Sequence, residues 1–238
     1  FFVGVVLMRS AGCAVNDFAD RYFDLKVERT KNRPVAIGKI KPIEALMVAA
    51  ALSFISFLLV LQTNFKTVML SFAALVLAVS YPFMKRWTYF PQIVLGAAFA
   101  WSIPMAFSAV SNHIPMIAWV IYIATLVWTI SYDALYAMVD REDDLAAGIK
   151  SIAIFFGQKD RLAIALLQCI FLMLMCLVGW IEQYQPPYFM SLFFVLALFF
   201  YQHYLIRHRQ RMACFSAFLH NHWVGLLLFV GFYFGVSA

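Results

Sequence analysis

Long apolar runs alternate with short polar connections along this chain and dominate its hydrophobic pattern. Eight runs approach the ~20 residues that an α-helix needs to cross the hydrocarbon core of a bilayer. The runs occupy residues 1–15, 43–61, 67–84, 92–110, 117–139, 162–179, 188–205 and 215–235. The pattern therefore predicts an all-α, polytopic transmembrane helix bundle that forms a single domain over residues 1–238.

Composition sharpens this picture because it excludes a water-soluble protein. Apolar residues make up 64% of the chain and charged residues 13%, whereas soluble domains contain about 45–50% and about 25%. The high apolar content also excludes a disordered chain. The sequence begins at Phe1, inside an apolar run, so we expect that its true N-terminus is missing.

The basic residues are distributed unevenly between the two sides of the expected bundle. Sixteen of the 18 Lys and Arg residues lie in the connections after the first, third, fifth and seventh runs. The intervening connections hold only Lys66, and Arg9 lies within the first run. By the positive-inside rule, the basic connections face the cytoplasm. The net charge of +6 therefore reflects membrane topology and not nucleic-acid binding.

Two similar acidic motifs lie in and around the connections after the first and fifth apolar runs, which the charge pattern places on the cytoplasmic side. The first contains Asn16, Asp17, Asp20 and Asp24, and the second contains Tyr132, Asp133, Tyr136, Asp140, Asp143 and Asp144. Asp20 and Asp140 lie 120 residues apart, with four runs between them. This spacing suggests that a four-helix unit is duplicated within the chain.

Each motif places its carboxylates on one face if it is helical, because successive residues turn by 100°. Carboxylates stacked in this way repel one another, and ionisable groups at a membrane span indicate a functional site. Oxygen ligands suit Mg²⁺, which usually takes one or two carboxylates and shares its remaining positions with phosphate and water. Two facing motifs thus indicate a diphosphate held through metal ions. The alternative is an acidic loop neutralised by its own basic neighbours.

Basic and aromatic residues near the motifs are candidates for substrate binding. Lys85 and Arg86 end the third run, and Lys150 follows the second motif. Each can bind a diphosphate or a carboxylate, where arginine has the better geometry, or can serve only topology and the helix dipole. The rings of Tyr132 and Tyr136 can shield a cation, although most aromatic residues in such a chain pack or contact lipid.

At these residues the sequence resembles the UbiA superfamily of intramembrane prenyltransferases. The acidic motifs carry the resemblance to the superfamily. Residues 9–17, 81–86, 91–107 and 132–144 make it closest to the branch that uses 4-hydroxybenzoate. Members of the family have nine transmembrane helices, which implies that this chain lacks the first and retains two repeated four-helix units.

The resemblance implies Mg²⁺-dependent transfer of a polyprenyl group from a polyprenyl diphosphate to the ring carbon ortho to the phenol of 4-hydroxybenzoate. It implies a role in ubiquinone biosynthesis at the bacterial inner membrane. The implied metal ligands are Asn16, Asp20, Asp24, Asp140 and Asp144. Asp140 or Asp144 is the candidate base, and Arg86 is the candidate partner of the benzoate carboxylate or the diphosphate. Lys85, Lys150, Tyr132 and Tyr136 complete the expected substrate site.

Other functions stay open at this point. A secondary transporter also has internal repeats and acidic residues, but its site lies near the midplane of the membrane, whereas these acids gather at one rim. A scaffold without enzymatic activity has no need of two matched acidic motifs. Among enzymes of the family, dihydroxynaphthoate, homogentisate, haem and a chlorophyll precursor are alternative acceptors.

Overall fold

The computed structural model describes residues 1–25, 27–28 and 30–236, and these residues form helices and connections without any strand. Two basic residues of the first long connection, Lys26 and Arg29, lie outside the described residues. The α-helices are α1 (Phe2–Asp24), α2 (Pro42–Val60), α3 (Phe65–Met84), α4 (Pro91–Ala100), α5 (Ser102–Ser111), α6 (Met116–Val139), α7 (Arg141–Ala147), α8 (Ile152–Phe156), α9 (Asp160–Ile181), α10 (Pro186–Leu205), α11 (Arg211–Leu219) and α12 (Asn221–Gly235). Short 3₁₀ turns, η1 (Gly157–Lys159) and η2 (Ile206–His208), precede α9 and follow α10.

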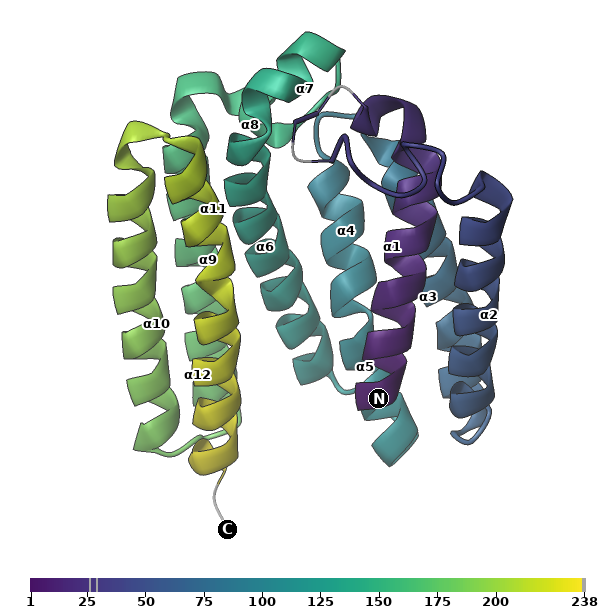
Figure 1. Cartoon of the computed structure of the whole chain (residues 1–238). Coiled ribbons are helices and arrows are strands. Elements are labelled where there is room, and N and C mark those ends of the chain that lie inside the picture. Colours follow the sequence, from purple (N-terminus) through teal and green to yellow (C-terminus); the bar gives the residue numbers. More distant parts are fainter. Residues whose placement is uncertain (26, 29, 237–238) are drawn as a thin grey trace.

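Eight segments of the described chain are long and apolar enough to cross a membrane, which confirms the predicted all-α bundle. Four of them are single helices, namely α1, α2, α3 and α6. The other four combine consecutive helices or 3₁₀ turns and cover Pro91–Ser111, Ile152–Ile181, Pro186–His208 and Arg211–Gly235. All eight stand side by side (Figure 1), and the start of α1 and the end of α12 lie opposite the end that carries α7 and α8.

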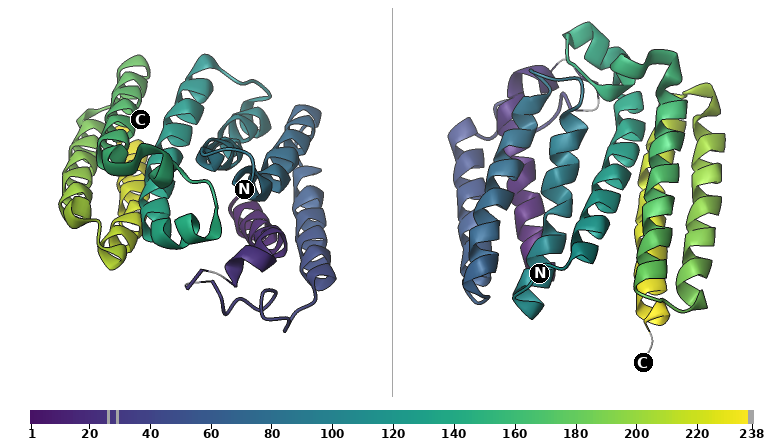
Figure 2. Two further views of the ribbon diagram at one scale, coloured as in Figure 1. Left: turned by 90° about the horizontal axis from the view of Figure 1, so that it is seen from above. Right: turned by 180° about the vertical axis from the view of Figure 1, so that it is seen from behind.

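The bundle consists of two groups of helices that α6 joins. Seen from above, α1–α5 form one group and α9–α12 form the other (Figure 2). Helix α6 packs against α4 in the first group and against α9 and α11 in the second. The end of the bundle with α7, α8 and the connection after α1 is here called the motif end, because both acidic motifs lie there (Figure 1).

Local sequence signals set the ends of several spans. Proline stands at the start of α2, α4 and α10, where its missing N–H costs no helical hydrogen bond. At the start of α3, the Asn64 side chain accepts a hydrogen bond from the Thr67 backbone N–H at 2.9 Å, as expected of an N-cap. At the end of α5, Asn112 adopts a left-handed conformation with φ 54°, which asparagine tolerates better than most residues.

Two of the spans are interrupted in their middle, and each interruption has a local cause. The fourth span breaks at Trp101, between α4 and α5. Pro104 lies four residues after Ala100 and has no N–H to donate to the Ala100 carbonyl. The eighth span breaks at His220. There the Asn221 side chain donates to the freed carbonyls, at 3.2 Å to Ala217 and 3.1 Å to Phe218.

The two breaks support the internal duplication that the acidic motifs suggest. Trp101 and His220 lie 119 residues apart, almost the same spacing as between Asp20 and Asp140. Each break falls in the fourth span of its half of the chain, since the two broken spans are the fourth and eighth of the eight spans. The chain therefore contains two four-span units with matching motifs and matching breaks.

The two groups differ in how tightly they pack. Buried positions make up 11% of the apolar stretch of α1 and 33% of that of the Ile152–Ile181 span. Both clusters of buried apolar side chains lie among α6 and the helices that follow it. The outer surface is covered with large apolar side chains, of which Phe2, Val110 and Phe229 are examples. Such an exposed apolar surface is expected for helices that face lipid.

Candidate active site

The first acidic motif lies on α1 itself and not in a connection. The expected run of 1–15 is too short, because the helix continues to Asp24. A helix of 23 residues rises about 35 Å at 1.5 Å per residue, which exceeds the ~30 Å hydrocarbon core. The last turns of α1 therefore reach the polar interface, where Asn16, Asp17, Asp20 and Asp24 lie on consecutive turns.

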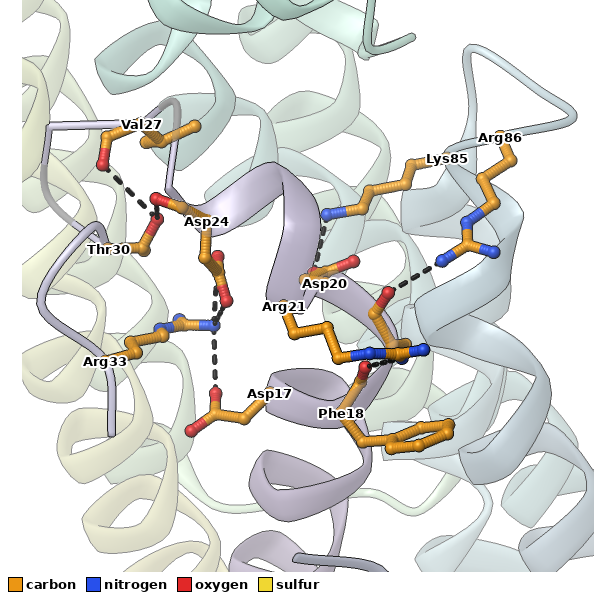
Figure 3. A network of polar contacts seen from close by, with 11 residues as sticks. Asp17, Phe18, Asp20, Arg21, Asp24, Val27, Thr30, Arg33, Lys85 and Arg86 are labelled. Carbon is orange, nitrogen blue, oxygen red and sulfur yellow. Dashed lines mark hydrogen bonds and ion pairs between the residues drawn. The ribbon is translucent and has the colours of Figure 1, made fainter. Parts of the chain in front are cut away.

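Basic side chains from elsewhere in the chain neutralise these carboxylates (Figure 3). Arg33 bridges two turns of α1, with its Nη1 atom 2.9 Å from Asp17 Oδ1 and 3.2 Å from Asp24 Oδ2. Lys85 Nζ lies 2.5 Å from Asp20 Oδ2. Asp20 and Asp24 are only 4% and 5% exposed, so their charges need such partners.

The end of α3 holds both Lys85 and Arg86 against α1. The Arg86 guanidinium donates to the Ala19 carbonyl at 2.6 Å (Figure 3). It also lies 5.6 Å from the centre of the Phe23 ring and 5.4 Å from that of Phe83, within the range of a cation–π contact. The predicted basic pair is therefore brought to the first acidic motif.

The second acidic motif lies where α6 ends and α7 begins. Placing Asp133, Asp140 and Asp144 on one continuous helix is wrong, because α6 ends at Val139 and α7 begins at Arg141. Asp140 therefore sits at the junction and is 8% exposed. Arg211, at the start of α11, forms an ion pair with Asp143 and lies 3.7 Å from Asp140.

Among the motif residues outside the spans, Asp144 has the carboxyl pKa that departs most from its ordinary value. Burial raises the pKa of Asp144 to about 7, and the nearby charge of Asp140 adds to the increase. The nearby charge of Lys85 opposes it. A cation beside this carboxylate would favour its charged form. Because its carboxylates are close together, the second motif is suited to binding a cation.

Residues of both motifs lie near the end of α3. Lys85 pairs with Asp20 of the first motif and also interacts electrostatically with Asp144 of the second. One turn earlier on α3, Tyr81 lies near both Asp20 and Asp133. The two acidic motifs are therefore brought to the same end of the bundle, and Lys85 interacts with a carboxylate of each.

The remaining expected site residues occupy different places around the motifs. Asn16 is half-buried on the motif face of α1. Tyr132 and Tyr136 lie on α6, and both pack against Phe218, with ring centres 6.0 and 4.9 Å away. Lys150 points toward the connection between α3 and α4, where its Nζ atom lies 3.4 Å from the Trp87 carbonyl. Lys150 therefore contacts the edge of the site, and its role in substrate binding stays a prediction.

The structure also brings polar residues to the site from within the membrane spans. Arg9 on α1 donates to Cys13 Sγ at 3.0 Å and interacts electrostatically with Asp133. The Gln92 side chain on α4 is hydrogen-bonded to Asp133. The sequence carried a signal for Arg9 and Asp133, because a charge within an apolar span is rare and usually functional. Gln92 carried no such signal.

The donor groups fit a metal that is shared with an anionic ligand. Within the described residues, no three His, Cys, Asp or Glu side chains gather closely enough to enclose a metal ion. However, Asp20 Oδ1 is buried and has no hydrogen-bond partner, and the motifs offer hard oxygen donors. Mg²⁺ usually takes one or two carboxylates and completes its coordination with phosphate and water. A closed protein cage is therefore not required.

These features define an integral membrane protein with a polar, charge-rich site at one end of its bundle, suited to an anionic ligand. Residues 1–230 match the UbiA prenyltransferase family, and the chain belongs to this family. The resemblance seen in the acidic motifs is thus confirmed, and the chain is grouped with prenyltransferases and not with transporters.

Curated relatives with closely similar sequences share one name. A 4-hydroxybenzoate octaprenyltransferase from Aeromonas hydrophila subsp. hydrophila is 56% identical over 97% of this chain and 80% of the relative. One from Psychromonas ingrahamii is 53% identical over 99% of this chain and 82% of the relative. The similarity therefore extends over both acidic motifs and all eight spans.

Solved structures share the fold at lower sequence identity. The apo structure of a UbiA homolog from Aeropyrum pernix K1 superposes with a TM-score of 0.85 at 23% identity, covering 97% of this chain and 86% of that one. A UbiA homolog from Archaeoglobus fulgidus, bound to GPP and Mg²⁺, gives a TM-score of 0.72 at 18% identity, covering 98% and 88%. These comparisons establish the fold of the bundle.

Proposed function

We propose that this chain transfers a polyprenyl group from a polyprenyl diphosphate to the ring carbon of 4-hydroxybenzoate ortho to the hydroxyl, as in ubiquinone biosynthesis. The product is a 3-polyprenyl-4-hydroxybenzoate. One observation carries the proposal: two acidic motifs lie at one end of a membrane bundle, where Lys85 interacts with a carboxylate of each. The name shared by relatives at 53–56% identity supports the choice of acceptor.

The motif carboxylates are the groups that would hold Mg²⁺ and, through it, the diphosphate. The proposed ligands are Asn16, Asp20, Asp24, Asp140 and Asp144. Bound there, Mg²⁺ would supply electrostatic stabilisation of the departing diphosphate. Two solved structures of a UbiA homolog from Archaeoglobus fulgidus with the same fold contain GPP with Mg²⁺ and DMAPP with Mg²⁺, which supports this assignment.

The basic side chains of the site have roles of their own. Lys85 lies between the motifs and neutralises Asp20, so it is placed to bind diphosphate oxygens that enter between the two rows. Arg86 is anchored to Ala19 on α1 and offers a planar guanidinium to a carboxylate or phosphate. Lys150 approaches from the α7–α8 connection and adds positive charge at the rim of the site.

Loss of the diphosphate leaves an allylic carbocation that must be kept from water. The aromatic faces of Tyr132 and Tyr136 line α6 next to the second motif and can stabilise positive charge. The ring carbon of the acceptor attacks this cation, and the ring proton then leaves to a base. Asp140 and Asp144 are the candidate bases, because both lie at the α6–α7 junction beside these tyrosines.

The distribution of charge suggests how the protein sits in its membrane. The basic connections gather at the motif end, so the positive-inside rule places this end in the cytoplasm. We propose the bacterial inner membrane as the location. Both a soluble aromatic acid and a lipid-borne diphosphate can reach a site at that rim, the first from water and the second from lipid.

A membrane assay tests the proposed function. Membranes containing the protein would receive a radiolabelled polyprenyl diphosphate together with 4-hydroxybenzoate, dihydroxynaphthoate or homogentisate. We expect labelled product with 4-hydroxybenzoate and at most trace product with the other two. A Glu182→Gln variant, changed on the opposite rim, serves as the matched control. Labelling of another acceptor in preference to 4-hydroxybenzoate, or of none, would refute the assignment.

A further inference from the structure

A buried carboxylate outside both acidic motifs organises the motif end of the second group. Asp160 is the first residue of α9 and only 3% exposed. Its side chain accepts hydrogen bonds from two arginines that are distant in sequence. Arg141 Nη1 lies 3.2 Å from Asp160 Oδ2, and Arg209 Nη2 lies 2.8 Å from Asp160 Oδ1. Asp160 therefore joins three separate segments of the chain.

Arg209 forms hydrogen bonds with both carboxylate oxygens of Asp160. The Arg209 Nε atom donates to both carboxylate oxygens, at 3.1 and 3.0 Å, and Nη2 also donates to the Gln158 carbonyl at 2.8 Å. Arg209 holds a left-handed backbone conformation with φ 53°, which is uncommon for a residue other than glycine. The void beside Asp160 is about 10 Å³, at the lower limit for one water. The arginines therefore replace solvent as partners of this carboxylate.

Both arginines are close in sequence to residues of the second acidic motif or to its basic partner. Arg141 follows Asp140 in the chain, so holding the Arg141 side chain restrains the junction between α6 and α7. Arg209 precedes Arg211 by two residues, and Arg211 pairs with Asp140 and Asp143. Asp160 thus restrains the second motif in two ways. It holds Arg141, which is part of the α6–α7 junction, and it holds Arg209, which is close in sequence to the motif's partner Arg211.

The second motif needs such a restraint because no continuous helix carries it. Asp140 lies between α6 and α7, with a non-helical ψ of 5°, and α7 has only seven residues. Short helices have little stability of their own. The first motif, in contrast, lies on the 23-residue helix α1, which by itself sets the spacing of its carboxylates.

We propose that Asp160 is a positioning residue for the second acidic motif, acting through Arg141 and Arg209 to fix Asp140 and Arg211. It touches neither substrate nor metal. This inference rests on the proposed function, because it assigns Asp140 to the diphosphate site. Residues that orient metal ligands from behind typically contribute 10–100-fold to metal affinity, which sets the expected effect.

Binding of Mn²⁺, as a spectroscopic substitute for Mg²⁺, tests the proposal without turnover. Purified full-length protein in detergent would be titrated with Mn²⁺ in the presence of inorganic pyrophosphate, and free Mn²⁺ would be followed by electron paramagnetic resonance. We expect Asp160→Asn to weaken Mn²⁺ binding about 10-fold or more. Arg209→Lys, a milder change that keeps the charge but loses the paired hydrogen bonds, should weaken it about 3–10-fold and serves if Asp160→Asn does not fold.

A matched control separates positioning from general damage. Gln202→Leu alters a fully buried residue between α9 and α10, where Gln202 accepts a hydrogen bond from Gln168 at 2.9 Å. It should lower the thermal midpoint but leave Mn²⁺ affinity within about twofold. Hydrogen exchange gives the second readout: amides of residues 141–147 should exchange faster in Asp160→Asn, whereas those of residues 16–24 should be unchanged.

The outcomes distinguish this inference from the proposed function. Failure of the wild-type protein to bind Mn²⁺ with pyrophosphate would overturn the proposed function. Normal wild-type binding together with unchanged binding in a folded Asp160→Asn or Arg209→Lys variant would overturn the positioning role alone. Equal loss of affinity in Gln202→Leu would also overturn it, because the effect would then follow stability and not the arginine network.

Discussion

The two acidic motifs have similar sequences, yet the fold holds them in different ways. The first lies on the continuous helix α1, in the loosely packed half of the bundle, where 11% of the apolar stretch is buried. The second lies at the junction of α6 and α7, beside the span Ile152–Ile181, where 33% is buried. Helical geometry sets the carboxylate spacing in the first motif, whereas arginines from other segments set it in the second.

This difference shows that a repeated motif need not be supported by repeated interactions. Arg33 and Lys85 form ion pairs with the first motif, Arg33 from the connection after α1 and Lys85 from the end of α3. Arg211 forms ion pairs with the second motif, and the role that we propose for Asp160 is to restrain that motif through Arg141 and Arg209. We therefore expect the first motif to tolerate loss of its basic partners better than the second. The following experiments challenge or refine that expectation.

The largest effect is expected when either motif loses a carboxylate. Asp20→Ala and Asp140→Ala should each reduce prenyl transfer about 10³-fold or more, since stabilisation of a leaving diphosphate is worth several kcal/mol. The measurement is labelled product formed by membranes with matched amounts of inserted protein, with Glu182→Gln as control. Wild-type rates for one of the two variants would show that only the other motif serves the reaction.

Removal of divalent metal should affect both motifs at once. Adding EDTA to the membrane assay should reduce product to background, and excess Mg²⁺ should restore it, because the carboxylates need a cation to hold the diphosphate. Turnover that persists in EDTA would contradict the proposed site. Restoration by Mg²⁺ in wild type, but only at higher concentrations in Arg211→Ala, would link metal use to the second motif.

Loss of the basic partners tests the comparison most directly. Arg211→Ala should raise the Mg²⁺ concentration for half-maximal activity about 10-fold or more, because Asp140 then loses the arginine that helps to hold it in position. Arg33→Ala should raise it only about 2–5-fold, since α1 keeps its carboxylates in place and a partly exposed ion pair contributes little. Equal effects of the two substitutions would show that helix continuity does not protect the first motif.

The smallest effect concerns stability and its dependence on pH. Burial raises the pKa of Asp144 to about 7, so the folded, metal-free protein binds this proton more tightly than the unfolded chain does. Stability is therefore lost as pH rises from about 4 to 7. Asp144→Asn should raise the thermal midpoint by about 2–4 °C at pH 8 and by less at pH 5. Asp24→Asn, which loses an ion pair with Arg33, should give no such increase.

Hydropathy and spacing predicted much of this protein correctly. The eight spans are confirmed, and both acidic motifs lie at the same end of the bundle. The errors concern places where a helix continues or stops. Helix α1 runs on through Asp24, and α6 stops before Asp140, although both stretches look alike in sequence. The break at His220 was also not expected, because the eighth span contains no proline and the Asn221 side chain compensates the lost hydrogen bonds.

The amino-acid sequence by itself determined the number of spans, the end of the bundle that carries most of the charge and the residue types of the site. These properties depend on local hydrophobicity and local spacing, because the thickness of the bilayer sets the length of apolar sequence that a spanning helix needs. Only the tertiary structure decided which charges meet. Arg86 reaches Ala19 across 67 residues, and Arg209 reaches Asp160 across 49. Such pairings depend on how apolar helix faces pack against one another, and many faces in this chain are equally apolar.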